Sequence, residues 1–369
     1  MKVRMNVLKH AIAPVALAAL MAGCGGPGGP QEKNVWIPVS DGDTYYYLDK
    51  KGDVVTPEVA VKETSVFYDD YAVVRVDGRS GYLGRDGKLA IPAEYLRATR
   101  FSEGLAFVRK EDKPPIQAID KAGEVVFTFP NEVSDARRFS EGLAAFEMGY
   151  KWGYVDRIGK VVIEPAYAKA GDFSNGLAFT NKGYVDKNGA PAFEADLDTG
   201  GPFSAKGYAV VSTYDRRGVQ YGVINRKGEY VIAASDIYAN ILADGDEFIV
   251  YENDGDHYLA GRINEAGKPS VDFDYEDIKP FGGSKYAGAR PEFDDAFGII
   301  DLKGQIIVEP QFAQFVSSFK GGMAVVRNGY RSGDGMKIIN EKGETLMDLE
   351  YPATVSEDFI TGGRYDSIF

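Results

Sequence analysis

Short apolar runs alternate with glycine-containing polar turns along almost the whole chain. The clearest instance is residues 149–167, which read GYKWGYVDRIGKVVIEPAY. An aspartate that opens a turn can cap backbone amides, and a glycine that closes it can adopt positive φ without steric cost. Asp156 and Gly159 fit these roles, so the pattern predicts a hairpin between two strands. Pro165 cannot donate to a sheet, and it predicts that a third strand ends there at a sheet edge.

The same arrangement recurs along the chain at regular intervals. Its turn glycines are Gly52, Gly87, Gly123, Gly159, Gly189, Gly228, Gly267, Gly304 and Gly343. Successive glycines lie 30 to 39 residues apart, and a fixed period of this size is typical of repeat architectures. The sequence therefore predicts an all-β domain of nine tandem antiparallel three-stranded β-meander repeats, each of about 36 residues.

A second motif lies between these turns and resembles Phe-Ser-Glu-Gly. Its clearest copies pair Phe101 with Gly104, Phe139 with Gly142, and Phe173 with Gly176. Upstream of each copy, apolar residues recur at every third position. That spacing predicts a helical turn or a 3₁₀ segment that fills the gap between neighbouring units.

The third apolar run of the unit predicts how the units are arranged. Residues 161–163 read Val-Val-Ile and residues 306–308 read Ile-Ile-Val, without polar alternation. A strand of this kind is expected to be covered on both faces, which requires stacked neighbours. A β-propeller-like ring satisfies this requirement and is the favoured architecture. An open superhelical β-repeat array is the alternative, because nine units exceed the usual four to eight blades of a propeller.

Several motifs together resemble the bacterial WG-repeat family. The Trp-Gly pair is Trp152-Gly153, and Tyr154, Asp156, Gly159 and Pro165 continue the motif. The resemblance covers residues 35–351 and implies that these residues define a structural repeat. Tyr221-Gly222 and Phe297-Gly298 replace the Trp-Gly pair in other copies, so exchange among aromatic residues points to packing.

The N-terminus carries a different signal. Residues 1–23 combine Lys2, Arg4 and Lys9 with a short apolar stretch, which is typical of an export signal. The stretch ends in LMAGC and resembles the lipobox of bacterial lipoproteins, with Met21 where the family usually has Leu. The resemblance implies cleavage before Cys24 and lipidation of its thiol. Residues 24–34, rich in Gly and Pro, are expected to form a tether, and residues 35–369 the β domain.

Composition excludes several kinds of chemistry. His257 is the one histidine outside the predicted signal and Cys24 the one cysteine, so zinc sites of His and Cys and cysteine nucleophiles are excluded. A net charge of −13 disfavours binding to nucleic acid. Acidic stretches at residues 41–47 and 252–258 resemble fragments of calcium loops but lack the full ligand series. The sequence thus predicts no catalytic residue, cofactor or metal.

Two classes of function remain. The first is an envelope lipoprotein, anchored to the membrane through lipid, that binds a protein or polysaccharide partner without catalysis; the outer membrane is its expected location. The second is a glycan-active enzyme, or its accessory subunit, that uses paired carboxylates. Aromatic residues such as Tyr45, Tyr46 and Tyr47 either pack between units or contact a partner.

Overall fold

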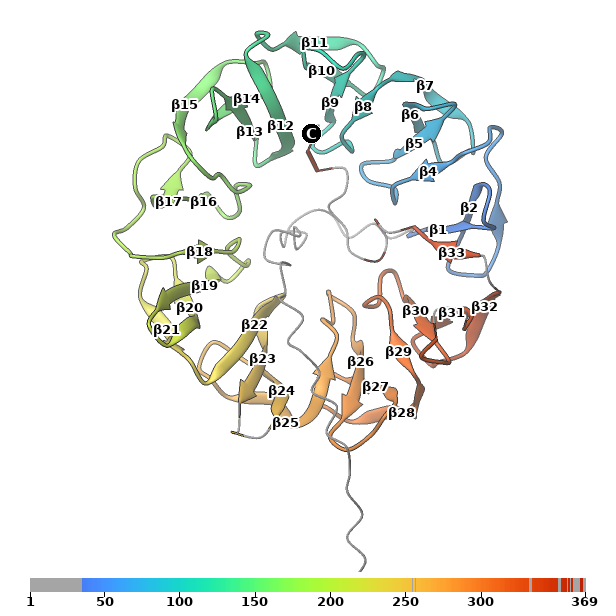
Figure 1. Cartoon of the computed structure of the whole chain (residues 1–369), viewed down its shortest axis with the longest axis vertical. Helices are drawn as coiled ribbons and strands as arrows, with labels where there is room; N and C mark the ends of the chain where they lie inside the picture. The colour runs from blue at the N-terminus through green and yellow to red at the C-terminus, as the bar shows by residue number, and fades with distance from the viewer. Residues whose placement is uncertain are drawn as a thin grey trace, which may run out of the picture.

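The chain forms a closed ring of small antiparallel sheets (Figure 1). The computed structural model describes residues 35–253, 255, 257–331, 334–350, 353–356, 358, 360, 366 and 367. In this part of the chain the assigned elements are 33 β-strands, and no helix is long and apolar enough to cross a bilayer. The predicted signal, Cys24 and the predicted tether lie outside the described residues.

Six of the sheets are regular four-stranded blades. From the inner to the outer strand, their elements are as follows: blade 1, β33 (Thr354–Val355), β1 (Ile37–Ser40), β2 (Tyr45–Leu48) and β3 (Val54–Val55); blade 2, β4 (Glu63–Thr64), β5 (Ala72–Val76), β6 (Arg79–Leu83) and β7 (Leu89–Tyr95); blade 3, β8 (Arg97–Ala98), β9 (Leu105–Arg109), β10 (Gln117–Asp120) and β11 (Val125–Thr128); blade 4, β12 (Val133–Ser140), β13 (Leu143–Met148), β14 (Lys151–Asp156) and β15 (Val161–Tyr167); blade 6, β18 (Thr199–Gly200), β19 (Tyr208–Asp215), β20 (Gly218–Asn225) and β21 (Tyr230–Ser235); blade 9, β29 (Gln314–Phe315), β30 (Met323–Arg327), β31 (Met336–Asn340) and β32 (Thr345–Leu349).

Two sheets depart from this plan. Blade 5 has two assigned strands, β16 (Leu177–Thr180) and β17 (Gly183–Asp186). The seven-stranded sheet contains β22 (Tyr238–Asp244), β23 (Glu247–Asn253), β24 (Tyr258–Ile263), β25 (Pro269–Ile278), β26 (Tyr286–Pro291), β27 (Phe297–Asp301) and β28 (Ile306–Phe312). Its long strand β25 pairs with both β24 and β26. It is thus the outer strand of blade 7 and the inner strand of blade 8, and the nine repeats form nine units.

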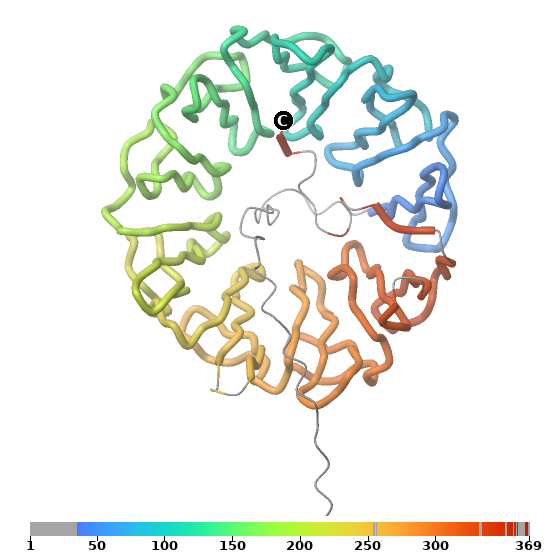
Figure 2. The backbone as a smooth tube through the Cα atoms, viewed as in Figure 1, coloured from blue at the N-terminus to red at the C-terminus, as the bar shows by residue number. Residues whose placement is uncertain are grey.

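The ring closes because the two ends of the described chain share blade 1. Strand β33 pairs with β1, with Val39 opposite Val355 and Ser40 opposite Thr354. The backbone tube accordingly runs once around the ring and returns to its start (Figure 2). This pairing confirms the predicted propeller and excludes the open array, whose terminal blades would each have left an edge to be protected.

The apolar residues with period three lie in strands or in extended segments that follow them, so the predicted helical or 3₁₀ segment is wrong. Val133, Ala136 and Phe139 all lie in β12 and are buried. The register of β12 against β13 shifts twice, between Val133 and Asp135 and between Ala136 and Phe139. Each bulge adds a residue to the strand, which turns a period of two into three. This segment is the innermost strand, so a regular unit has four strands and not three.

The prediction that the third apolar run is covered on both faces is also wrong. Val161 and Val162 are 39% and 37% exposed in the outer strand β15. Pro165 lies inside β15 and does not end it, although β15 is an edge strand as predicted. A proline within an edge strand removes a donor that another strand could use.

The hydrophobic core consists of nine clusters, each formed between adjacent units. The phenylalanines of the Phe-Ser-Glu-Gly motif are among its most buried residues. Phe139 stacks on Phe107 of the preceding blade with ring centroids 5.2 Å apart. Phe173 meets the ring of Tyr154 at 4.8 Å. Because every cluster joins two blades, no blade has a core of its own.

Candidate functional site

The Trp-Gly motif occupies the middle of a blade. Trp152 and Tyr154 are buried against the next unit, so their aromatic walls are not available to a ligand. A Cβ atom on Gly153 would lie 2.5 Å from the backbone oxygen of Ile163. The glycine is required because the bulged strand β15 crosses β14 at this point. Gly298 has the same close contact, at 2.5 Å from the Val308 oxygen.

The aspartate of the repeat closes the outer hairpin turn. Asp156 Oδ1 accepts hydrogen bonds from the backbone amides of Ile158 at 3.0 Å and Lys160 at 2.9 Å. Gly159 has a φ of 86°, which a side chain would strain. Equivalent caps, in which the side chain accepts two backbone amides, are made by Asp49, Asp120, Asp186, Asn225, Asn264, Asp301 and Asn340.

The ring has two unlike faces. Successive turns of an antiparallel meander alternate between the ends of its strands, so the inner and outer hairpin turns of a blade share one face wherever both are present. We call it the staple face, because side chains on it join neighbouring blades as described below. The middle hairpin turns, such as that of Gly149 and Tyr150 between β13 and β14, share the opposite face. We call that one the aromatic face.

Carboxylates join neighbouring blades on the staple face. Glu103 Oε2 accepts the amide of Gly142 in the next blade at 2.9 Å. Glu141 Oε2 in turn accepts the amide of Gly176 at 2.8 Å. The hydroxyl of Ser140 donates to the backbone oxygen of Phe173 at 2.7 Å. The polar residues of the Phe-Ser-Glu-Gly motif therefore form intramolecular staples.

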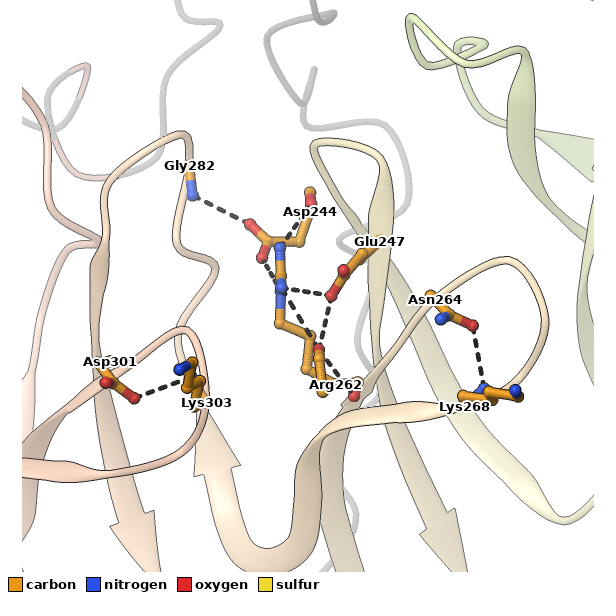
Figure 3. A network of polar contacts seen from close by, with 9 residues as sticks. Asp244, Glu247, Arg262, Asn264, Lys268, Gly282, Asp301 and Lys303 are labelled. Atoms are coloured by element: carbon orange, nitrogen blue, oxygen red, sulfur yellow. Dashed lines mark hydrogen bonds and ion pairs between the residues drawn. The ribbon is translucent and has the colours of Figure 1, made fainter.

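The same kind of staple is buried between blades 7 and 8 (Figure 3). Asp244 Oδ1 accepts a hydrogen bond from the backbone amide of Gly282, with N and O 3.0 Å apart. Its Oδ2 accepts a hydrogen bond from Arg262 Nε at 2.7 Å. Arg262 also pairs with Glu247, whose carboxylate accepts a hydrogen bond from the Ser270 hydroxyl at 2.6 Å. The side chain of Asp244 is 1% exposed. A buried charge must be paired in this way to be tolerated.

A second charged cluster lies where the C-terminal segment meets the inner strands. We call it the axial cluster, and it comprises Tyr68, Arg100, Arg138, Asp172, Lys320, Asp358 and Asp366. Arg100 pairs with Asp366, and Arg138 Nε lies 2.9 Å from Asp172 Oδ2. The guanidinium of Arg100 lies 3.7 Å from the ring centroid of Tyr68.

Burial shifts the titration of this cluster. It raises the pKa values of Asp358 and Asp366, and it raises the pKa of Tyr68 to about 12. Burial also lowers the pKa of Lys320 to about 8, against the opposing charge of Asp358. Such shifts occur at functional sites and in structural ion-pair networks alike. Here the acids hold the C-terminal segment, because Asp358 Oδ2 also accepts the amide of Val66 at 3.0 Å.

The aromatic face carries exposed rings in place of staples. Among the described residues, five of the six strongly exposed aromatic side chains lie at or beside its middle hairpin turns. They are Tyr150, Tyr214, Tyr258, Phe293 and Tyr330, exposed by 89%, 70%, 55%, 84% and 70%. Tyr150 and Phe293 also have positive φ values of 61° and 64°, a conformation that is strained for aromatic residues.

The other sequence candidates are placed as follows. Asp41 Oδ1 caps the amides of Asp43 and Thr44 at 2.9 Å each, so this part of the first acidic stretch is a turn. Tyr47 is fully buried. His257 packs edge-on against Phe293 with centroids 6.4 Å apart. In the described part of the chain, no three acidic, histidine or cysteine residues converge as metal ligands; residues 254 and 256 of the second acidic stretch lie outside it.

Sequence reasoning located the turns but missed both the staples and the aromatic face. The signal for the staples was the glutamate that recurs at Glu103 and Glu141 before the turn glycine. The signal for the aromatic face was weaker, because Tyr150 and Phe293 occupy turns that are not otherwise alike. Their common position is visible only once the units are aligned in space.

The fold and these motifs define a β-propeller assembled from tandem repeats. The model of the WG containing repeat matches residues 81–113, 118–152, 152–182 and 297–331. The chain therefore carries WG containing repeats at four places, as its motifs predicted. No curated protein sequence matches it.

Several solved structures align with the chain at low identity. A eukaryotic initiation factor aligns with a TM-score of 0.60 and 13% identity, over 87% of this chain and 98% of that one. Dihydro-heme d1 dehydrogenase NirN aligns with a TM-score of 0.44 and 14% identity, over 88% of this chain and 75% of that one. A putative dipeptidyl aminopeptidase IV from Bacteroides ovatus aligns with a TM-score of 0.43 and 10% identity, over 87% of this chain and 59% of that one. The first likeness supports the propeller fold, and none of them identifies an activity.

Proposed function

We propose that the protein is a lipid-anchored envelope protein whose propeller binds a partner without catalysing a reaction. The observation that carries this proposal is the concentration of exposed aromatic side chains on one face. Aromatic residues are enriched where proteins bind other molecules, because they supply large contact areas at low entropic cost. An exposed ring at a backbone position that strains it, as at Phe293, is consistent with a role outside folding.

The use of the carboxylates supports a binding role over a catalytic one. The repeated acids, such as Asp156 and Glu141, accept backbone amides. A carboxylate that satisfies backbone donors in this way is part of the scaffold. What differs from blade to blade is the middle hairpin turn, and binding specificity would lie there.

Anchoring is proposed from the sequence at Cys24. Its lipidation would hold the protein at the envelope, because several acyl chains provide stable attachment. The outer membrane is the expected location. Metabolic labelling with palmitate tests this: label should enter the wild-type protein and be lost in Cys24→Ser. Label that persists in the variant would overturn the anchor.

The alternative is a glycan-active enzyme, and the axial cluster is the observation that favours it. Asp358 and Asp366 have pKa values raised by burial, as catalytic acids often do. Hydrolysis of a panel of envelope glycans that is lost in Asp366→Asn would support this alternative. Absence of turnover with wild-type protein would leave the binding role as the better account.

Partner capture tests the main proposal. A photo-reactive phenylalanine analogue placed at position 150, 214, 258, 293 or 330 of the full chain should yield a crosslinked species in intact envelopes. The same analogue at Ile158, an exposed residue on the staple face, is the control. Crosslinks at none of the five positions would overturn the binding proposal.

A further inference from the structure

Three of the exposed rings lie on consecutive blades and form a continuous group. We call it the aromatic arc, and it comprises Tyr258 of blade 7, Phe293 of blade 8 and Tyr330 of blade 9. The ring of His257, next to Tyr258, packs on Phe293. The hydroxyl of Tyr330 donates to the backbone oxygen of Asp295, two residues after Phe293. These contacts link the three middle hairpin turns into one surface.

The surroundings of the arc are acidic. Glu292, Asp294 and Asp295 flank Phe293 in its turn, and Asp334 lies in the turn of Tyr330. Among the described residues between β26 and β27 and between β30 and β31, Arg331 is the one lysine or arginine. Asp294 Oδ1 caps the amide of Ala296 at 2.9 Å and Asp334 Oδ2 caps the amide of Arg331 at 2.7 Å. The donors in both of these hydrogen bonds are backbone amides, which carry no charge.

The arc lies on the face opposite to the one on which the described chain begins. A Cβ atom on Gly321 would lie 2.6 Å from the Cβ of Val35, the first described residue. Gly321 belongs to the inner hairpin turn between β29 and β30, so the described chain begins on the staple face. If the preceding residues carry a lipid anchor, the aromatic face is the face opposite the attachment point.

We propose that the aromatic arc is the docking surface for a protein partner that presents lysine and arginine side chains. This inference rests on the proposed binding function and specifies its surface and its partner. Aromatic rings attract cations through the negative charge of their faces, and nearby carboxylates strengthen that attraction. A neutral glycan would gain nothing from the net negative charge, whereas a basic protein surface gains from both features.

Tyr150 provides a matched control within the same face. It is the most exposed of the five rings and occupies a middle hairpin turn, as Phe293 does. It is flanked by Gly149 and Lys151 in place of acids. A basic partner should therefore not bind at Tyr150, whereas non-specific binding to exposed rings would involve Tyr150 and the arc equally.

The test uses full-length protein in detergent and a labelled peptide of alternating Arg, Lys, Gly and Ser residues as the probe. Tyr258→Asn combined with Phe293→Asn should weaken peptide binding about 3- to 10-fold without any change in net charge. Tyr150→Asn should leave it unchanged. Asparagine tolerates positive φ, and thermal melting verifies that each variant folds.

The charge of the surface is tested separately. Asp294→Asn with Asp295→Asn keeps the turn cap but removes two charges, and it should weaken binding and flatten its salt dependence. Equal losses in the Tyr150 and arc variants would overturn the proposal. So would salt-independent binding of an N-acetylglucosamine oligomer that is lost in the arc variant, because that result would identify a glycan as the occupant.

Photo-crosslinking in envelopes separates failure of this inference from failure of the proposed function. The analogue at position 293 should yield a protein adduct that disappears when Asp294 and Asp295 are changed to asparagine. Adducts at position 150 or 214 but not at 258, 293 or 330 would overturn the arc and leave the binding function intact. Adducts at none of the five positions would overturn both.

Discussion

The two faces of this propeller are built from the same repeats but use their turns differently. On the staple face the turn residues recur, and their carboxylates bond to the next blade, as Glu141 does to Gly176. On the aromatic face the turns differ between blades and carry exposed rings such as Tyr150 and Phe293. One face holds the ring together, and the other is free to vary.

The comparison shows how a repeat protein can separate stability from recognition. Since each core cluster lies between two blades, adjacent blades must be fixed relative to each other, and the staples do this at one end of the strands. Changes at the other end leave the staples intact. Substitutions should therefore cost stability on the staple face and affect binding on the aromatic face.

The largest effect is expected from breaking the buried staple. Asp244→Ala removes the acceptor for Gly282 and the more deeply buried of the two carboxylates that pair with Arg262. Removing one partner of a buried ion pair typically costs about 3–5 kcal/mol. Chemical denaturation should show a loss of this size in the free energy of unfolding.

A double variant is the control for this effect. Asp244→Leu combined with Arg262→Met removes both charges and should recover a large part of the lost stability. Glu141→Ala, at a more exposed staple, should cost only about 1–2 kcal/mol. If Asp244→Ala lowers the free energy of unfolding no more than Glu141→Ala does, the buried staple stabilises the fold no more than an exposed one.

The next largest effect separates the glycine of the Trp-Gly motif from a turn glycine. Gly153→Ala would place a Cβ atom 2.5 Å from the Ile163 oxygen, and we expect a loss of about 2–4 kcal/mol from overpacking and backbone shifts. Gly78, on the aromatic face, has a φ of 78° with open space around it, so Gly78→Ala should cost about 1 kcal/mol from strain alone. Equal losses measured by thermal denaturation would contradict this steric account.

The sequence predicted the features that depend on local backbone chemistry. The cap of Asp156 and the positive φ of Gly159 follow from residues only three positions apart. The number of units followed from the spacing of the turn glycines. Closure could not be read from these signals, because it depends on the pairing of Val39 with Val355 at opposite ends of the chain.

The remaining errors arose because the apolar pattern of a segment does not by itself reveal how the segment pairs or which surface it faces. A period of three suggested a helical turn, but bulges in β12 produce the same period in a strand. The consecutive valines Val161 and Val162 suggested burial on both faces, yet they lie on the outer edge of the ring. Valine also favours strands for conformational reasons, so an apolar run does not by itself establish burial.

A smaller effect is expected from the axial cluster, at the staple-face end of the inner strands. The pKa of Lys320 is about 8 in the folded protein, below its usual value of 10.5, because burial disfavours the charge. Between these two values the unfolded chain binds more protons than the folded one, so stability should rise with pH. Lys320→Met should increase stability at pH 7 by about 1–2 kcal/mol and remove this rise.

The matched variant is Lys320→Arg, which stays charged throughout this range. It should also lack the rise between pH 8 and 10.5, but its stability should be lower than that of Lys320→Met. Denaturation midpoints measured from pH 7 to pH 10.5 give both quantities. An unchanged rise in the methionine variant would assign the pH dependence to other groups.

The smallest effect concerns the aromatic face and has the opposite sign. Tyr150 has a φ of 61° in the tight turn between β13 and β14, where glycine would be unstrained. Tyr150→Gly should therefore stabilise the protein by about 0.5–1 kcal/mol, whereas Tyr150→Ala keeps the strain and should not. A stabilising glycine would show that this ring is retained at a cost to folding, as expected of a residue on a binding face. If the glycine variant is no more stable than the alanine variant, the strain at Tyr150 gives no reason to assign the ring a role beyond the fold.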